Sequence, residues 1–297
     1  MRFLTFIPLL LIVFLQICMI EPVLSLRNNK IGSAGTGSET AIVYRSLLEE
    51  HGMIIRTRIL TPDGYRRTIA PPNTFESYLR NLPLKPHNTI PKMYNGRTVR
   101  RLRAYEAVVD LAIGDKNLHQ CADAIIRLKA EFLFRQQQYD KIHFNFTNGF
   151  RVDYTEWMKG KRIVVKGNSS YWVQSSNASN TYQDLWQYLE TIFMWAGTAS
   201  LENELVPAPA DDIKIGDILI QGGTPGHAMI IVDAAVHSDT GEKIFLLAQS
   251  NMPAQEIQVV KNLADREISP WFRISNETSI MSGRWTFGSD DLKRFSD

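Results

Sequence analysis

The sequence predicts an α+β domain in which an antiparallel sheet packs against a helix that carries a cysteine. Residues 215–232 consist of two apolar runs separated by the glycine-rich turn 222–226, a pattern typical of two strands that form a hairpin. Further apolar runs predict strands over 243–248 and 256–260. The longest helical pattern covers about residues 118–138.

The predicted helix has one apolar face. Residues at helical spacing on this face are Cys121, Ile125, Leu128 and Phe132. Asn117 or Asp115 is the expected N-cap, because a side-chain oxygen there would accept a bond from the first free amides. Cys121 is therefore expected in the first turn, on the face turned toward the rest of the fold.

Shorter patterns predict the remaining elements. The alternation of arginine with Ile and Thr over Ile55–Ile59 predicts a strand, and Phe75–Leu82 is expected to be a short helix. Strands are expected over Tyr105–Ile113 and Ile142–Phe146. Asn180 to about Leu205 is expected to be helical, and its aromatic residues favour a role in the core over a sugar-binding platform.

The chain begins with the features of an export signal. Arg2 precedes the apolar run Phe3–Ile20, and Val23-Leu24-Ser25 suits cleavage, so residues 1–25 are expected to be a signal peptide. The run is long enough that a retained membrane anchor is the alternative. Residues 26–46 are rich in Gly, Ser and Asn and predict a flexible linker, and residues 47–297 are expected to form a single α+β domain.

Composition narrows the classes of partner. The net charge of +2 gives no reason to expect nucleic acid. The histidines show no spacing typical of metal ligands, and the turn 222–226 lacks the Lys-Ser/Thr ending of a phosphate-binding loop. We therefore expect no metal and no cofactor, and contact with a membrane only through the N-terminal signal segment.

Cysteine usage indicates a thiol site. Once residues 1–25 are removed, Cys121 is the only cysteine left, so no disulfide can form within the chain. An unpaired cysteine in an exported protein indicates either a reactive thiol or pairing between chains. The alternative is an inert cysteine in the core.

The position of Cys121 favours the reactive form. The N-terminus of a helix carries partial positive charge and stabilises a thiolate. His227 begins the second strand of the 215–232 pair and is the best candidate to share the thiol proton. His119 is closer in sequence, but residues two apart on a helix point in different directions.

A polar side chain is expected behind the imidazole. Gln249 and Asn251 follow the strand 243–248, which neighbours the strand of His227. They are two residues apart and share a face if the strand continues. The predicted catalytic set is therefore Cys121, His227 and Gln249, with Asn251 as the second candidate to orient the ring.

The order of these motifs resembles the papain-like cysteine peptidases of the NlpC/P60 and CHAP type. The shared features are a cysteine at a helix start, a Gly-Asp strand and the Gly-His strand 226–232. The resemblance implies a peptidase or amidase that acts on a cell-wall peptide. Cys121 lies farther from His227 than is usual in those families, which implies insertions around residues 145–200.

The chain also resembles a family of exported bacterial proteins, the domain of unknown function 4846. The segments that carry this resemblance are Tyr78–His87, Gln120–Ala124, Phe146–Phe150, Gly222–Ala228, Ala248–Gln255 and Ser269–Phe272. The family name implies no activity.

Two functions remain open. The first is an exported cysteine hydrolase, periplasmic or associated with the cell envelope, whose substrate is a cell-wall peptide or a related amide. The second is a protein of the same fold without catalysis, in which the same cleft holds a peptide or glycan for an envelope protein complex.

Overall fold

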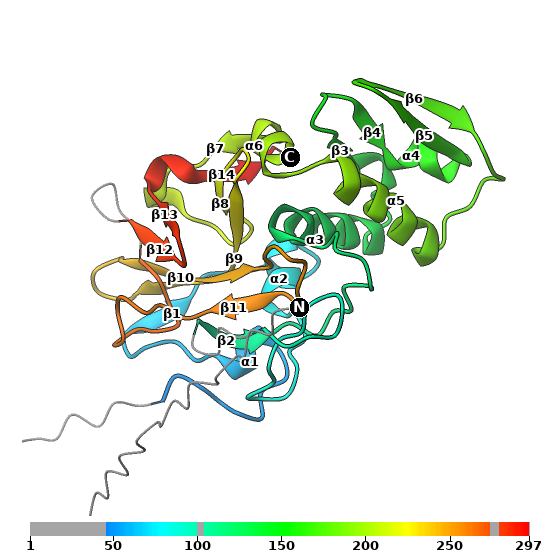
Figure 1. The fold of residues 1–297 in the computed structure, drawn as a ribbon. Coiled ribbons are helices and arrows are strands. Elements are labelled where there is room, and N and C mark those ends of the chain that lie inside the picture. Colours follow the sequence, from blue (N-terminus) through cyan, green and yellow to red (C-terminus); the bar gives the residue numbers. More distant parts are fainter. Residues whose placement is uncertain (1–45, 100–103, 274–278, 297) are drawn as a thin grey trace, which may run out of the picture. The chain divides into compact units, whose positions relative to one another are not determined.

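A large antiparallel sheet forms the centre of the protein in the computed structural model (Figure 1). The structure describes residues 46–99, 104–273 and 279–296, so the predicted signal peptide and residues 26–45 of the predicted linker lie outside the described residues. The strands of this sheet are β1 (Tyr65–Arg67), β2 (Tyr105–Val108), β7 (Leu205–Pro207), β8 (Ile218–Gln221), β9 (His227–His237), β10 (Lys243–Gln249), β11 (Gln258–Val260) and β14 (Leu292–Phe295).

The strands predicted from residues 215–260 lie next to one another in the sheet. The order is β2-β11-β10-β9-β8-β14-β7, with β1 paired to β9, and every pair is antiparallel. Gln221 lies opposite His227 across the hairpin, and Ala248 lies opposite Ile230 on the other side of β9. Nine successive residues of β9 from His227 to Ala235 are buried, so this strand is covered on both faces.

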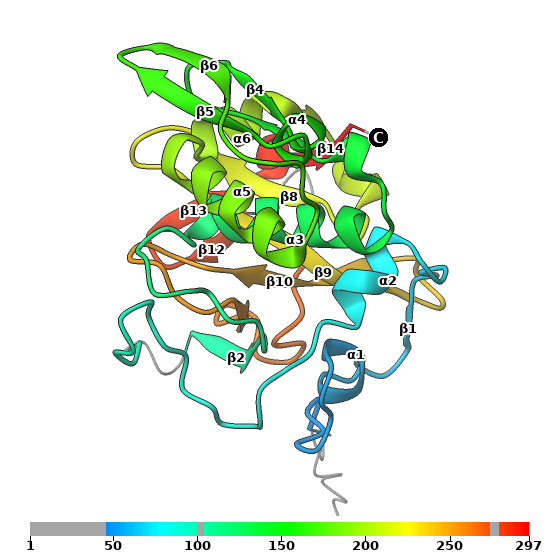
Figure 2. The same ribbon diagram turned by 90° about the vertical axis from the view of Figure 1, so that its right-hand side faces the viewer.

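Helix α3 (Cys121–Arg135) covers one face of this sheet and packs against β9 (Figure 2). Ile125 and Leu128 are buried as predicted. The predicted N-caps are wrong, because the helix begins after Gln120, whose amide donates to the Asp123 carboxylate at 2.9 Å. Asn117 instead accepts a hydrogen bond from the backbone amide of Ala254.

The predicted strand over Ile55–Ile59 is wrong, because residues Ile55–Arg58 form the short helix α1. Ile55 and Ile59 are both buried, and residues four apart lie on one side of a helix. Arg58 is also buried, and its Nε donates to the carbonyl of Gly52 at 2.7 Å. The predicted short helix over Phe75–Leu82 is confirmed as α2 (Phe75–Arg80).

A long segment between α3 and the sheet forms a set of smaller elements. They are η1 (Tyr139–Lys141), β3 (His143–Asn145), β4 (Arg151–Asp153), α4 (Tyr154–Met158), β5 (Lys161–Lys166), β6 (Ser169–Gln174), α5 (Tyr182–Trp195) and α6 (Thr198–Glu204). Strands β3 and β4 pair with each other, as do β5 and β6. The helix predicted over 180–205 is two helices, since the chain is extended at Ala196 and Gly197.

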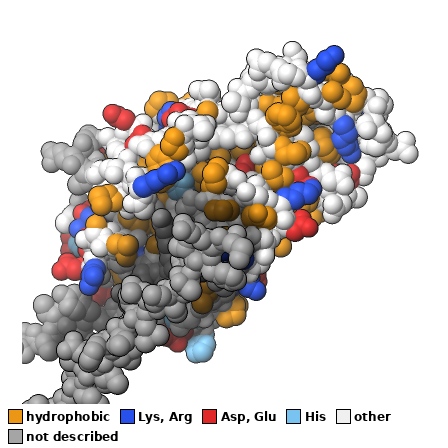
Figure 3. Space-filling model, viewed as in Figure 1, with side chains coloured by type: hydrophobic (Ala, Val, Ile, Leu, Met, Phe, Trp, Pro, Cys, Tyr) orange, Lys and Arg blue, Asp and Glu red, His pale blue; other side chains and the backbone are white. Residues whose placement is uncertain are grey.

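The aromatic residues of α5 divide between the core and the surface. Tyr188 and Phe193 are buried, as predicted, whereas Trp195 is 45% exposed. Hydrophobic side chains gather on the surface over this part of the protein (Figure 3), and the large exposed ones in it are Tyr171, Tyr182, Met194 and Trp195. The prediction of a purely internal role therefore does not hold for Trp195.

The C-terminal part of the chain forms a separate hairpin and then adds strand β14 to the sheet. Strands β12 (Ile280–Ser282) and β13 (Trp285–Phe287) form this hairpin. The short helix η2 (Ala210–Asp212) precedes β8, and η3 (Ser289–Asp291) precedes β14. The described residues form one compact unit. Within the described residues, no helix is both long and apolar enough to cross a membrane.

Candidate active site

Cys121 is the first residue of α3 and is partly exposed. The helix packs against β9, and the backbone of Ala228, the second residue of that strand, acts to lower the pKa of the thiol. Burial raises the pKa of the thiol above its ordinary value, while the backbone groups of Ala228 and Ala122 act in the opposite direction. The packing of α3 on β9 thus brings the thiol to the residue that follows His227.

His227 is held from behind by Gln249. The ring is 2% exposed, and its Nε2 lies 2.6 Å from Oε1 of Gln249. An amide oxygen can only accept, so Nε2 carries the proton and Nδ1 of the neutral ring keeps a free lone pair. Burial lowers the pKa of His227, and the bond to Gln249 opposes this effect.

Aromatic rings from the C-terminal hairpin cover the imidazole. The Trp285 ring stacks on His227 with a centroid distance of 5.6 Å and an interplanar angle of 16°. Phe287 lies 6.3 Å away from the same ring. The guanidinium of Arg284 lies over the Trp285 ring, 5.1 Å from its centroid. Trp285 and Phe287 therefore contribute to the burial of the imidazole.

The turn before His227 requires glycine at position 226. A Cβ there would lie 2.1 Å from Oγ1 of Thr198 and 2.7 Å from the carbonyl oxygen of Gly223. Thr198 begins α6 and donates to the same Gly223 carbonyl at 3.1 Å. The Gly-His sequence is therefore a packing requirement, because it lets α6 approach the turn that positions the imidazole.

Asn251 does not take the place expected for it beside His227. Strand β10 ends at Gln249, so the alternation that would put both side chains on one face stops there. The Asn251 carboxamide oxygen instead accepts the backbone amide of Met252 at 2.9 Å. Of the two predicted orienting residues, the structure brings Gln249 to the ring.

Cys121 and His227 are neighbours through the backbone but do not form a hydrogen bond. Within the described residues, the helix of Cys121 packs on the strand of His227, and the imidazole hydrogen bond goes to Gln249. With the pKa of the thiol raised and that of the imidazole lowered, both groups are uncharged in the resting protein. Such a pair can pass the proton from sulfur to nitrogen only as a new bond to sulfur forms.

Comparison with known families identifies the chain. Residues 55–294 match the family described as "Domain of unknown function (4846)". The chain belongs to this family. No curated protein and no solved structure matches it.

In this member of the 4846 family, the Gly-Asp sequence before the site is structural. Asp217 is 2% exposed, and its carboxylate accepts two bonds from Arg294, at 2.9 Å and 2.8 Å. A third bond comes from the backbone amide of Lys214. The carboxylate therefore fastens β14 to the start of β8 and is not directed toward Cys121.

Two buried groups beside Cys121 were not predicted from the sequence. Asp123 is nearly fully buried, which raises its pKa to about 8, and its second oxygen has no partner among the described residues. His119 is fully buried, and burial lowers its pKa to about 3. Gln120 and Asp123 are three residues apart, the spacing of a capping pair, and this spacing could have indicated the position of the Asp123 carboxyl.

The described residues do not suggest a metal centre. They contain no group of three or more His, Cys, Asp or Glu side chains that could hold an ion. His227 also has its Nε2 engaged by Gln249. The arrangement around Cys121 is suited to nucleophilic chemistry by the thiol itself.

Proposed function

We propose that the protein is an exported cysteine hydrolase, a peptidase or amidase with a papain-like arrangement of the NlpC/P60 or CHAP type. The observation that carries this proposal is the position of Cys121 at the start of the helix that packs on β9, the strand whose first residue, His227, is bonded to Gln249. Nucleophile, base and orienting group thus occur in the order and on the elements that this chemistry needs.

The topology supports the proposal. The cysteine begins a helix that packs against β9 and β10 of the antiparallel sheet, as the resemblance in motifs implies. The interval between α3 and β8 holds the elements from η1 to η2, and in this proposal the part of it around residues 145–200 is an insertion. A shared arrangement of this kind is an analogy of fold, so the site has to be tested by its chemistry.

The proposed reaction uses His227 as a base and then as an acid. The Cys121 sulfur attacks an amide carbonyl while its proton passes to Nδ1 of His227. The backbone amides at the start of α3, including that of Cys121, would stabilise the resulting oxyanion. The C–N bond then breaks as Nδ1 returns the proton to the leaving amine. Water, deprotonated by His227, hydrolyses the thioester and frees the thiol.

Gln249 has a fixed role in this scheme. Its amide oxygen accepts the hydrogen bond from Nε2, so Nε2 stays protonated. Nδ1 is then available both to take the proton from the thiol and to return it to the leaving amine. Trp285 stacks on one face of the ring and excludes water from that face. The proposed substrate is a cell-wall peptide or a related amide, met in the periplasm or at the cell envelope after export.

One observation favours the second candidate, a binding protein without catalysis. The thiol has a raised pKa and no hydrogen bond to His227 in the described part of the chain, as suits a silent site. The exposed aromatic side chains of Tyr171 and Trp195 would give such a protein a surface for a peptide or glycan.

Acylation by an activated ester separates the two. With p-nitrophenyl acetate, the hydrolase should release p-nitrophenol in a burst, and intact-mass spectrometry should show one acetyl group on Cys121. The Cys121→Ser variant should lose the modification, and His227→Ala should slow it at neutral pH by about 100-fold or more. Equal rates in the wild type and His227→Ala, or a thiol that reacts only on unfolding, would contradict the hydrolase.

Cell-wall fragments are the second stage of the test. A reactive enzyme should convert some of them into products with a new amino group, whereas a binding protein should retain them unchanged. Alkylation of Cys121 by iodoacetamide, measured against pH in the wild type and in His227→Ala, reports the same base without assuming a substrate.

A further inference from the structure

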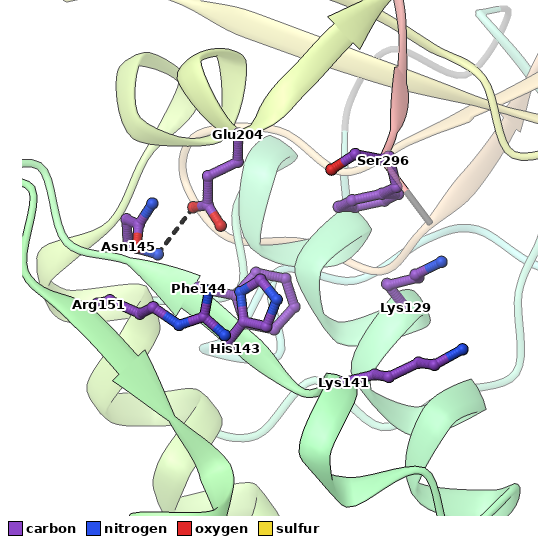
Figure 4. Close-up of a pocket in the computed structure, with 9 residues that line it drawn as sticks. Lys129, Lys141, His143, Phe144, Asn145, Arg151, Glu204 and Ser296 are labelled. Atoms are coloured by element: carbon purple, nitrogen blue, oxygen red, sulfur yellow. Dashed lines mark hydrogen bonds between the residues drawn. The ribbon is translucent and has the colours of Figure 1, made fainter.

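A cavity of about 230 Å³ lies in another part of the molecule, among α3, β3, β4, α6 and the end of β14 (Figure 4). None of the four predicted catalytic residues lines it. Lys129 lies eight residues after Cys121 on α3, which places it about 12 Å farther along the helix axis. The cavity is therefore a separate site.

Three Lys and Arg side chains line the cavity. Lys129, Lys141 and Arg151 come from three different elements, and His143 lies between them on β3. The Lys129 ammonium is held 5.1 Å from the Phe295 ring, which lines the same cavity. In Figure 4 the side chains of Lys129 and Lys141 extend in the same direction. Arg151 uses its Nε to bind Asp153 at 2.8 Å in a pair open to solvent.

Among the described residues that line the cavity, Glu204 carries the only acidic side chain. One of its oxygens accepts the backbone amide of Asn145 at 2.8 Å (Figure 4). Burial raises the pKa of this carboxyl to about 7, against the effects of Asn145 and Arg151. Near neutral pH the carboxyl is therefore protonated much of the time, so it offsets little of the positive charge and can donate a hydrogen bond.

We propose that this cavity binds a small dianionic ligand that carries a phosphate group. Lysine and arginine side chains are the groups that proteins use for phosphate, and several of them match a dianion better than a single carboxylate. The volume lies below the range of about 300–1,000 Å³ typical of drug-sized ligands, so the ligand must be small. The rings of Phe144 and Phe295 would face any carbon attached to the phosphate.

Calorimetric titration of the purified protein at constant ionic strength tests this site. Inorganic phosphate or glycerol 3-phosphate should bind saturably with a dissociation constant of about 1 mM or lower, and acetate should bind more weakly. Tighter binding of glycerol 3-phosphate would identify a phosphate ester as the ligand type, and tighter binding of inorganic phosphate would identify the free ion. Either result supports the site.

Charge-removing variants locate the binding. Lys141→Met and Arg151→Met should each weaken phosphate binding by about tenfold, the effect of one lost hydrogen bond to a charged group. Lys166→Met is the matched control, because Lys166 is exposed on β5 and does not line the cavity. The absence of saturable binding, or equal affinity in the wild type and both cavity variants, would overturn the proposal.

The pH dependence gives a second readout. Among the described residues, the other charged or titratable groups that line the cavity or interact with Glu204 are Lys129, Lys141, His143, Arg151 and Tyr188, and Asp153 acts on His143. Sulfate stays a dianion throughout, so its affinity for the wild type should fall between pH 6 and pH 8 as Glu204 ionises. Glu204→Gln should abolish that fall, and a fall that persists in this variant would contradict the role given to Glu204.

Discussion

The imidazole of His227 and the carboxamide of Gln249 are joined by a 2.6 Å contact between Nε2 and Oε1. The two residues lie on the neighbouring strands β9 and β10, at the edge where β9 begins and β10 ends. Because a neutral amide oxygen accepts without bringing charge, the contact fixes the ring's protonated nitrogen while leaving the imidazole neutral. Burial then lowers the pKa of the ring.

A carboxylate in place of this amide should reverse that balance. In Gln249→Glu the new negative charge would stabilise imidazolium, and we expect the pKa of His227 to rise by about 1–3 units. Titration of the His227 Cε1 proton by NMR measures the shift. Gln187→Glu, an exposed change on α5, adds the same charge away from the ring and should leave it unmoved. An unchanged pKa in Gln249→Glu would show that the contact is absent in solution.

The ring cover supplied by Trp285 gives a second prediction. Since burial is the largest cause of the lowered pKa of His227, Trp285→Ala should admit water and return this pKa toward its ordinary 6.5. Trp285→Phe keeps an apolar ring there and should give an intermediate value. If the pKa stays equally low in Trp285→Ala, the desolvation must come from Phe287 and the sheet, and Trp285 would have no part in tuning the base.

The sequence predicted the parts of the site that depend on local pattern. A cysteine at a helix start and a histidine at a strand start follow from apolar periodicity and turn residues, and both positions are as expected. The side chain of Gln249 meets His227 because β10 continues as far as Gln249. Asn251 lies beyond that end, which the apolar run 243–248 could not specify to within two residues.

Other features arise only from tertiary packing. Trp285 reaches His227 from a hairpin that is 58 residues farther along the chain, and no local pattern connects them. The segment Ile55–Ile59 fits both a strand alternation and a helical i, i+4 pair, and the burial of Arg58 against the Gly52 carbonyl decides for the helix. The charge on Asp123 likewise depends on burial, which the sequence does not give.

The close packing at Gly226 predicts a loss of stability without a change in charge. In Gly226→Ala the new methyl group would meet Thr198 and two backbone carbonyls, and relief requires movement of the turn or of α6. We expect the free energy of unfolding in a urea titration to fall by about 1–3 kcal/mol. Gly197→Ala is the control, because a Cβ there meets nothing within 4 Å. Equal losses in the two variants would argue against the close contact at Gly226.

The buried carboxyl of Asp123 predicts an unusual dependence of stability on pH. Its pKa is raised from 3.8 to about 8 in the folded protein, so between these values the folded state holds a proton that the unfolded chain has released. This carboxyl therefore lowers stability as pH rises from about 4 to 8, by at most ~1.4 kcal/mol per pH unit. Asp123→Asn removes this titration. Its free energy of unfolding, relative to that of the wild type, should therefore increase as pH rises across this range.

A second variant separates this effect from the loss of the helix cap. Asp123→Ala also removes the bond from the Gln120 amide, which costs about 1 kcal/mol independently of pH. Urea titrations at pH 5, 6.5 and 8 should therefore give parallel curves for the two variants, offset by that amount, and a steeper decline for the wild type. Parallel behaviour of all three proteins would mean that Asp123 is ionised when folded. The start of α3 would then hold a negative charge beside Cys121, which would disfavour the thiolate.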